Sequence, residues 1–178
     1  ELDPADAGVE ARLFARALDG AISLPGSLQA QGFGDLPSGS SAWVARIGLS
    51  LLGDPRYAPY REPGRFRTPF WLTPERHYVG AAWYQRDVEI PANWAGRRIV
   101  LYLERPHWET RVWIDAAPAG TANGLGTPHE YDLTEHLSPG THRLTIRVDN
   151  RMIVPVGRDA HSVSDQTQSA WNGIVGRI

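Results

Sequence analysis

The sequence predicts an all-β protein, built as an antiparallel sandwich or barrel. Three observations predict this fold class: segments after residue 77 alternate apolar and polar residues, turn signals separate them at fairly regular spacing, and 178 residues include 18 Gly and 14 Pro. Alternation with a period of two turns one row of side chains toward a core. Gly and Pro at this density interrupt long helices. We therefore expect short strands joined by turns.

The N-terminal third of the chain predicts several kinds of secondary structure. Residues 5–18 carry apolar residues near one helical face and predict a short N-terminal helix. Residues 21–24 predict a short strand, and residues 32–41 have the composition of a loop. The apolar run 42–52 is compatible with either a strand or a helix. Residues 53–69 contain four Pro and predict an irregular excursion.

The strand signal is strongest in the second half. Four segments predict strands, namely 82–90, 98–104, 110–115 and 141–150. The last of them alternates over its whole length, with Leu144, Ile146 and Val148 on one face. Turns rich in Asn, Gly and Pro lie between these segments, as an antiparallel sheet requires.

Composition excludes several classes of function. The net charge is −2, so we expect neither nucleic acid nor a membrane surface as a main partner. All 18 basic residues are Arg, which excludes a Walker P-loop and a Schiff-base lysine in this chain. There is no Cys, and no apolar run reaches the roughly 20 residues of a membrane helix.

Motifs that carry chemistry are absent. The glycines of 120–126 do not match the dinucleotide fingerprint. His129 and His136 are seven positions apart, whereas the zinc-protease helix needs four, so we interpret them as ordinary loop residues. No pair of carboxylates stands in a pattern typical of a glycosidase acid and nucleophile. We therefore expect no catalytic residue, no metal site and no cofactor in this chain.

The aromatic residues point toward carbohydrate. Sugar rings stack on indole faces, and their hydroxyls pair with carboxylate, amide and guanidinium groups. Among the seven Trp, Trp83 and Trp113 lie inside predicted strands, where core packing is the better interpretation. The Trp residues in or beside loops, where packing and ligand contact both remain open, are Trp71, Trp94, Trp108 and Trp171.

Six motifs in order resemble the N-terminal domain of glycoside hydrolase family 2, which includes β-galactosidases, β-glucuronidases and β-mannosidases. The most characteristic is the strand Trp83-Tyr84-Gln85-Arg86-Asp87-Val88-Glu89-Ile90-Pro91. The others are the segments 94–101, 111–115, 128–134, 139–150 and 171–178. In 115–120 the chain lacks the Asn-Gly turn of the family, so we expect a differently shaped loop there.

The resemblance implies a jelly-roll β-sandwich, similar to galactose-binding domains. It implies one domain over 1–178 with an irregular excursion at 28–68, as a non-catalytic accessory part of a longer glycoside hydrolase that cleaves O-glycosyl bonds. Both catalytic Glu residues of the family lie on a TIM barrel that this chain lacks. The implied partners are a carbohydrate (a β-glycoside) and the remaining domains of the same polypeptide.

The resemblance also implies a contact with substrate. In β-galactosidases of the family, an acidic residue eight positions before the Gly of the closing motif reaches into the sugar pocket. In this chain that residue is Asp165, before Gly173. Trp171 and Asn172 adjoin the same motif, and His161 is a further candidate on the same grounds. The alternative for Asp165 is a loop aspartate that caps a turn.

Two other classes of function stay open: a free-standing carbohydrate-binding module, and a purely structural sandwich without a ligand. The chain closes on the strand-like segment 173–178, which favours the accessory domain, since an independent module is expected to end after its last strand. An unfinished strand edge would also promote pairing between copies.

Overall fold

A computed structural model describes residues 1–44, 48–157, 159–161, 163–167 and 171–178 of the chain. The chain forms two compact units. Unit 1 comprises 1–27, 80–151 and 172–178, and unit 2 comprises 28–79 and 152–171. Along the chain, unit 2 is therefore inserted into unit 1 at two places.

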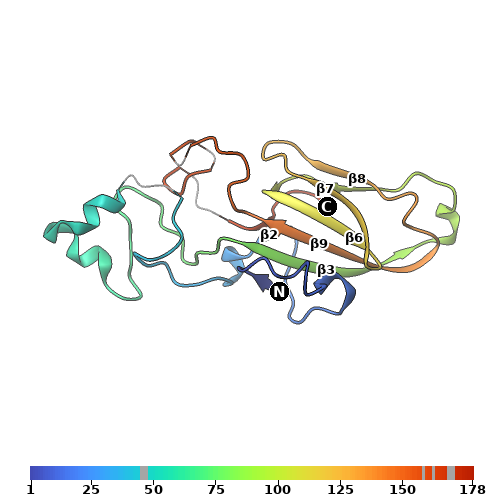
Figure 1. Ribbon diagram of the computed structural model, residues 1–178, viewed down its shortest axis with the longest axis horizontal. Helices are drawn as coiled ribbons and strands as arrows, with labels where there is room; N and C mark the ends of the chain where they lie inside the picture. The colour runs from blue at the N-terminus through green and yellow to red at the C-terminus, as the bar shows by residue number, and fades with distance from the viewer. Residues whose placement is uncertain (45–47, 158, 162, 168–170) are drawn as a thin grey trace. The chain divides into compact units, whose positions relative to one another are not determined.

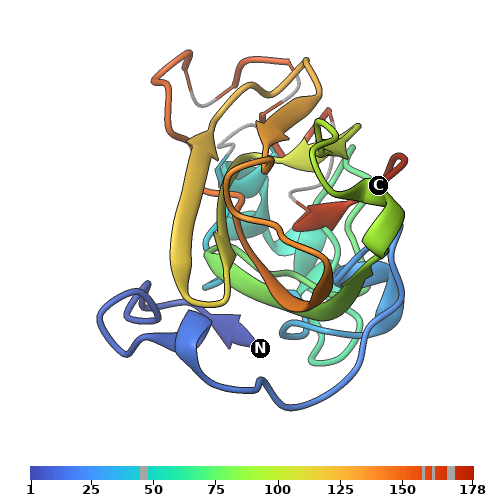
Figure 2. The ribbon, with the colours of Figure 1, turned by 90° about the vertical axis from the view of Figure 1, so that its right-hand side faces the viewer.

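Unit 1 is an antiparallel β-sandwich, as the sequence predicts (Figures 1 and 2). Its main sheet has five strands in the order β1-β3-β9-β6-β7, and every pair in it is antiparallel. The strands are β1 (Leu2–Asp3), β3 (Ala81–Ile90), β9 (Gly140–Asp149), β6 (Glu109–Ile114) and β7 (Ala117–Ala122).

Two smaller sheets complete the sandwich. One has the order β2-β10-β5, and the other pairs β4 with β8. Their strands are β2 (Gly26–Ser27), β10 (Gly173–Ile174), β5 (Pro106–His107), β4 (Val100–Leu103) and β8 (His129–Asp132). The four strands predicted in the second half are confirmed as β3, β4, β6 and β9, with ends that differ by one or two residues.

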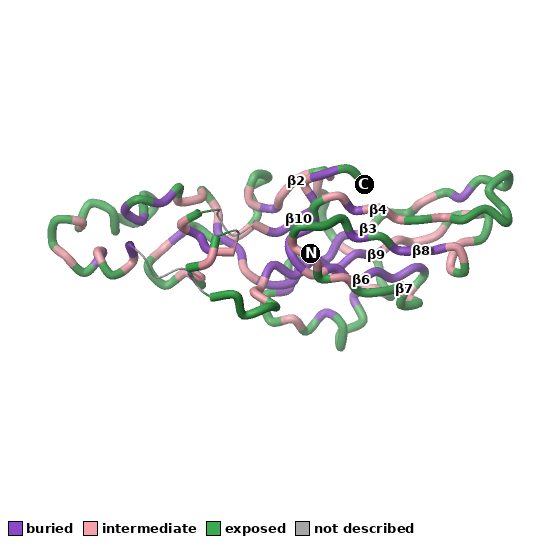
Figure 3. Tube along the Cα trace, turned by 90° about the horizontal axis from the view of Figure 1, so that it is seen from above, coloured by how far each residue is buried: buried purple, intermediate pink, exposed green. Residues whose placement is uncertain are grey.

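The two faces of the main sheet bury different side chains. Tyr84 pairs with Ile146, and Ile146 pairs with Val112, so all three lie on one face and are buried. The opposite face carries Trp83 and Trp113, which pack on the N-terminal segment through Leu13, as expected for Trp inside strands. Figure 3 shows the buried stretches on β3, β9 and β6, whereas β7 is mostly exposed.

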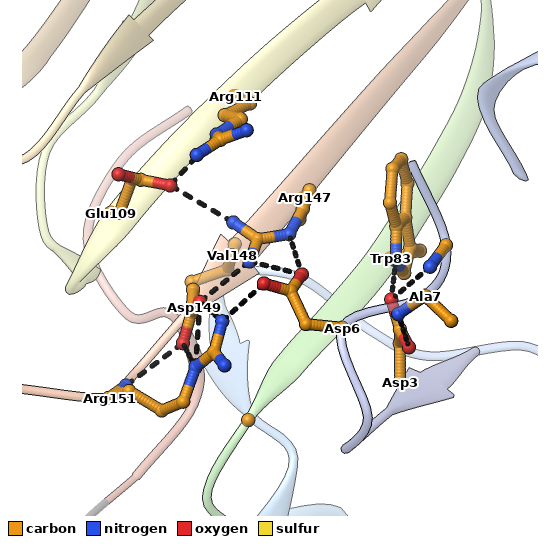
Figure 4. A network of polar contacts seen from close by, with 12 residues as sticks. Asp3, Asp6, Ala7, Trp83, Glu109, Arg111, Arg147, Val148, Asp149 and Arg151 are labelled. Atoms are coloured by element: carbon orange, nitrogen blue, oxygen red, sulfur yellow. Dashed lines mark hydrogen bonds and ion pairs between the residues drawn. The ribbon is translucent and has the colours of Figure 1, made fainter. Parts of the chain in front are cut away.

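The same face carries an ionic cluster around Arg147 (Figure 4). The Arg147 side chain is only 1% exposed and forms ion pairs with Asp6, Glu109 and Asp149. Arg151 binds Asp6 and Asp149 in turn. Because Asp6 lies in the N-terminal segment, the cluster ties that segment to β9.

The predicted helix over 5–18 is wrong except for one turn, the 3-10 helix η1 (Leu13–Ala15). The Asp3 carboxylate accepts hydrogen bonds from backbone amides four and five residues later, which fixes a tight loop. Asp6 and Arg12 then adopt positive φ angles of 56° and 53°, which a right-handed helix does not allow. These local side-chain bonds override the favourable helix propensities.

The strand predicted at 21–24 is also wrong, because strand pairing begins later, in β2. In β10, Gly173 has a φ of +146°, and a Cβ added there would lie 2.3 Å from the carbonyl oxygen of Gly26. Such a close approach needs a glycine. β10 therefore pairs with Gly26 and Ser27, and the apolar run at 21–24 lies before the paired residues.

The turn at Asp115-Ala116 also differs from expectation. It is a tight two-residue loop, because Ile114 pairs with Ala117 on either side of it. Asp115 and Ala116 have φ angles of 48° and 72°. Positive φ at both central residues is the geometry for which Asn-Gly is preferred. The hairpin is therefore as tight as one with an Asn-Gly turn, although its residues suit the conformation less well.

His129 is not the loop residue that the sequence predicts. It lies in β8 and is buried, and its Nδ1 lies 2.6 Å from the Thr110 hydroxyl. Within the described ranges, no group of His, Cys, Asp and Glu is arranged to hold a metal ion. No helix in the part of the chain that the structure describes is long and apolar enough to cross a bilayer.

The described part of unit 2 contains short 3-10 helices and one isolated bridge, between Asp35 and His77. Its helices are η2 (Gln29–Gln31), η3 (Leu49–Gly53) and η4 (Pro55–Arg61), whereas η5 (Ala92–Trp94) belongs to unit 1. The ambiguous run 42–52 thus ends in η3, and its residues 45–47 lie outside the described residues.

Candidate functional site

An aromatic cluster forms the core of unit 2. Trp43, Leu52, Phe66 and Trp71 are buried together, and Leu49 of η3 packs against them. The Trp43 ring contacts Trp71 edge-on at 5.5 Å and stacks on Phe66 at 6.0 Å between ring centroids. The 3-10 helices and loops of unit 2 have no regular strand pairing to hold them together. Large aromatic side chains can instead bury the apolar area that such a core needs.

Asp165 is held at this cluster by the backbone. Its side chain is buried, and the residue is 3% exposed. The Oδ2 atom accepts a hydrogen bond of 2.6 Å from the backbone amide of Val44, which follows Trp43 in the chain. A loop aspartate that only capped its own turn would bond a nearby amide, but this bond spans 121 residues of sequence. Asp165 thus ties segment 152–171 to segment 28–79.

His77 is the second titratable group at this point. It is 4% exposed, and its ring centroid lies 4.4 Å from that of Trp43. Its Nε2 atom lies 4.0 Å from Oδ1 of Asp165, beyond hydrogen-bond distance. Burial lowers the pKa of His77, although the charges of Asp165 and Asp35 act in the opposite direction. The imidazole is therefore neutral at pH 7, and the two groups do not form an ion pair there.

Several buried polar atoms in unit 2 have no hydrogen-bond partner among the residues that the structure describes. They include Oγ1 of Thr68, Nε1 of Trp71, Nε2 of His77 and Oε1 of Gln166. Each such atom costs about 1–3 kcal/mol if it stays unsatisfied, so native proteins contain few of them. Trp43 contacts both the Trp71 and His77 rings, so these two groups belong to one neighbourhood.

Gly48 allows the chain to pass close to this neighbourhood. It has a φ of +84°, and a Cβ there would lie 2.8 Å from the Pro69 carbonyl oxygen and 3.2 Å from Nε1 of Trp71. A larger residue would therefore be strained and would crowd the indole. The result is a packed cluster of aromatic side chains with one buried carboxylate and one neutral imidazole beside it. These groups can bind hydroxyls.

The other residues singled out in the sequence lie in different surroundings. Trp171 is partly buried in unit 2, and His161 of the same unit is exposed. Asn172 belongs to unit 1 and is wholly buried: its Oδ1 accepts from the Tyr84 hydroxyl, and its Nδ2 donates to the carbonyls of Gly80 and Val148. Asn172 therefore supports the interior of the sandwich.

The loop tryptophans divide between packing and exposure. Trp71 and Trp108 are buried, and Trp108 donates from Nε1 to the carbonyl of Asn123. Trp94 of η5 is exposed. Sequence reasoning missed Trp43, Val44 and His77, because only the folded chain brings them to Asp165. A short run of aromatic residues at 66–71 was the only local signal of a cluster.

The other buried carboxylates have structural partners. Asp3 accepts from Ala7, Gly8 and the Trp83 indole, and Asp149 is bound by two arginines. A glycosidase acid and nucleophile need a reactive site between them, which these pairings do not provide. Among the described residues, Asp165 is thus the buried carboxylate that stands beside aromatic rings and a neutral imidazole.

Comparisons with known proteins consistently find family 2 glycosyl hydrolases and β-glucuronidases. A family model described as "Glycosyl hydrolases family 2, sugar binding domain" matches residues 1–177. The β-glucuronidase of Rattus norvegicus is 30% identical over 83 residues, which are 43% of this chain and 13% of that protein. The β-glucuronidase of Paenibacillus borealis is 30% identical over 87 residues, which are 47% of this chain and 15% of that protein.

Among solved structures, the β-glucuronidase of Ruminococcus gnavus in complex with uronic isofagomine has the same fold. The TM-score is 0.57 at 17% identity, over 85% of this chain and 20% of that one. The match to the curated relatives thus spans about an eighth of their length.

Proposed function

The chain belongs to the sugar-binding domain family of the family 2 glycosyl hydrolases, and from this premise we propose that it lends Asp165 to the sugar pocket of a β-glycosidase. In this proposal the chain carries no catalytic residue, and its partners are a β-glycoside and the remaining domains of the same polypeptide. The observation that supports it is the buried Asp165 carboxylate, fixed by the Val44 amide next to Trp43.

The carboxylate has one fixed oxygen and one that faces His77. A carboxylate accepts hydrogen bonds from sugar hydroxyls, and such charge-assisted bonds contribute about 1.5–3 kcal/mol each. Trp171 and His161 belong to unit 2 with Asp165 and remain candidates for the rim of the pocket. Because Asn172 is buried in unit 1, we assign it a positioning role at the start of β10.

Two expectations about architecture stay predictions. One is the jelly-roll connectivity, with which the strand order β1-β3-β9-β6-β7 is compatible. The other is that 1–178 form one domain, in which unit 2 is an excursion from the sandwich and not a separate module.

The test is kcat/KM of the polypeptide that carries this chain, measured on aryl β-glucuronide, β-galactoside and β-mannoside. Asp165→Asn keeps an oxygen for the Val44 amide but removes the charge, so we expect a fall of about 10- to 100-fold with an unchanged Tm. Asp149→Asn is the control, since Asp149 belongs to the ionic cluster and should lower Tm with little effect on kcat/KM. Full activity of Asp165→Asn would refute the proposal.

A further inference from the structure

We propose that His142 is a proton-dependent clamp, whose imidazolium form fastens the turn between β6 and β7 to the loop that precedes β9. The clamp is closed while the ring carries a proton on both nitrogens, and it loosens as the pH rises and one of these protons leaves. The inference does not depend on the proposed function, because all of its groups belong to unit 1 and none of them is Asp165.

Both ring nitrogens of His142 face an acceptor. Nδ1 contacts Oδ2 of Asp115 in the β6–β7 turn, and Nε2 lies 2.8 Å from the carbonyl oxygen of Ser138. A carbonyl oxygen can only accept a hydrogen bond, and the same is true of an ionised carboxylate. A neutral imidazole donates from one nitrogen and presents a lone pair on the other, so one of the two contacts would be repulsive. The imidazolium, in contrast, donates to both partners at once.

The Asp115 carboxylate is held in place as an ionised acceptor. Its Oδ1 accepts a hydrogen bond of 2.7 Å from the backbone amide of Arg143, and the Asp115 amide donates to the Arg143 carbonyl at 3.0 Å. The hydrogen bond from the Arg143 amide, assisted by His142, lowers the pKa of Asp115 against the opposing effect of burial. The carboxylate is therefore charged at pH 7, and its second oxygen is presented to the imidazole.

Further charged groups near His142 come from β3 and from β9 itself. Glu89 of β3 accepts a hydrogen bond from the hydroxyl of Thr141, the residue before His142. The guanidinium of Arg143, the residue after it, is paired with Asp87 of β3 at 3.1 Å. The positive charge of Arg143 is therefore offset, whereas Glu89 adds a negative charge that favours the imidazolium.

These contacts set the pH range in which the clamp works. The hydrogen bond to Asp115 has the largest effect and raises the pKa of His142. The Ser138 carbonyl and Glu89 act in the same direction, and burial opposes them. A group with a raised pKa stabilises the folded state fully below its unfolded value, about 6.5 for histidine, and loses this contribution as the pH rises through the folded value. The clamp is therefore closed below about pH 6.5 and opens as the pH rises beyond it.

The turn that the clamp holds is unfavourable for the residues that form it. Asp115 and Ala116 have positive φ angles of 48° and 72°, and neither is a glycine. Both residues and His142 line a cavity of about 350 Å³, so solvent reaches the clamp and its proton can exchange. Loss of the clamp should therefore loosen the hairpin at β7, which lies at the edge of the main sheet.

Two kinds of hydrogen exchange test the clamp in the polypeptide that carries this chain. Exchange of the imidazole Cε1 hydrogen, followed by mass spectrometry of peptides, measures the pKa of His142, which we expect above the ordinary value of about 6.5. Amide exchange of peptides covering 115–122, corrected for the intrinsic rate at each pH, measures opening of the hairpin. We expect the protection of 115–122 to fall about tenfold as the ring loses its proton, because a charge-assisted hydrogen bond is lost, while 81–85 of β3 keep their protection.

Asp115→Asn is the matched variant. Asparagine keeps an oxygen for the Arg143 amide and presents an N–H to Nδ1, so a neutral ring that donates from Nε2 satisfies both contacts. The pKa of His142 should then fall, and the protection of 115–122 should no longer depend on pH. His142→Gln is a second variant, since its amide reaches the position of Nε2, donates to the Ser138 carbonyl and does not titrate. It should also remove the pH dependence.

Three results would overturn the inference. The first is a pKa of His142 at or below its ordinary value, and the second is a protection of 115–122 that does not change with pH in the wild type. The third is an equal change in the wild type and in both variants, since another group would then control the hairpin. If Asp115→Asn does not fold, the comparison of the wild type with His142→Gln decides on its own.

Discussion

Arg147 shows how a single charged residue can organise a β-sheet surface. It is almost wholly buried on β9, yet it is surrounded by three carboxylates from different parts of unit 1 (Figure 4). A buried guanidinium is tolerated only when its donors and its charge are matched, and here Asp6, Glu109 and Asp149 match both. Alternation along 141–150 predicted the apolar face of this strand but not the ion pairs on its other face.

Replacing Arg147 should be far more costly than replacing its neighbour on β6. Arg147→Met leaves three carboxylates close together with only Arg151 and Arg111 as partners, so we expect a loss of about 3–5 kcal/mol in the free energy of unfolding. Arg111 is much more exposed and forms its ion pair with Glu109, so Arg111→Met should cost about 1 kcal/mol or less. Urea unfolding of both variants measures the difference, and equal losses would contradict this account of the cluster.

The cluster also predicts how stability depends on pH. Burial acts to raise the pKa of Asp149, but hydrogen bonds from Arg151 and the charge of Arg147 outweigh it, so the pKa lies below its ordinary value. A carboxyl with a depressed pKa stabilises the fold fully above the unfolded value of about 3.9, and loses this contribution as the pH falls through the folded value.

We therefore expect the free energy of unfolding to fall steeply below about pH 4, as followed by urea titration at several pH values. Asp149→Asn removes the titrating group, so the free energy of unfolding should fall less steeply below about pH 4. At pH 7 the variant should be less stable than the wild type. An equally steep fall in the variant would show that other groups control acid unfolding.

The candidate site was only partly predictable at this scale. The resemblance to family 2, in which an acidic residue stands eight positions before the Gly of the closing motif, singles out Asp165, and that side chain is buried. The nearby groups could not be predicted, because Val44 lies 121 positions away and bonds through its backbone, which leaves no trace in residue type. For Asn172 the position beside the motif was misleading, since its side chain serves the interior of the sandwich.

Among the elements, long strands were predictable and short ones were not. β3 and β9 run side by side over 10 residue pairs, and such strands alternate long enough to be recognised. β7 has a weak strand composition and lies at a sheet edge, and β2, β5 and β10 have two residues each. The pairing of these short strands depends on a close approach between backbones, as at Gly173. The periodicity of the sequence does not predict such an approach.

The β6–β7 hairpin yields a prediction at this scale. Ala116 has a φ of 72°, which is strained for any residue with a Cβ. Ala116→Gly should therefore raise the free energy of unfolding by about 0.5–1 kcal/mol. The control is Ala117→Gly in the adjacent strand, where lost strand propensity should be destabilising. Thermal unfolding by circular dichroism measures both, and a lower Tm for Ala116→Gly would argue against strain in the turn.

At the scale of the whole molecule, two kinds of architecture share one chain. Unit 1 is held by long ladders, whereas the described part of unit 2 relies on aromatic packing, 3-10 helices and single long-range bonds such as that between Asp165 and Val44. Backbone amides outside ladders open more readily, because fewer bonds must break together. The composition of 28–68 predicted irregularity but not a core of its own.

Hydrogen exchange should distinguish the two units. We expect the amides of β3 and β9 to exchange most slowly, and those of 28–79 and 152–171 to exchange faster, as resolved by mass spectrometry of peptic peptides. Phe66→Ala should speed exchange in unit 2 while leaving β3 and β9 unchanged. Equal protection of both units would mean that the chain opens as one cooperative body.

The buried carboxylates that the structure describes form no catalytic pair, which leads to a prediction for the chain on its own. Asp3 and Asp149 are occupied in structural bonds, and one carboxylate at Asp165 is insufficient for glycoside cleavage. We expect no turnover above buffer when residues 1–178 alone are assayed with aryl β-glycosides. Turnover that an Asp or Glu substitution within the chain abolishes would contradict this expectation.

The hydrogen bonds of Gly80, Asn150 and Asn172 have an evolutionary consequence. Gly80 donates to Oδ1 of Asn150, and its carbonyl accepts from Nδ2 of Asn172. Gly80 and Asn172 are the first residues of unit 1 after two of the four crossings between the units along the chain, and Asn150 lies just before a third. Since the strand ends are fastened to one another there, the intervening segments can lengthen, shorten or be replaced without undoing the scaffold. Mutation can thus remodel the inserted segments of unit 2 while the sandwich of unit 1 keeps its frame.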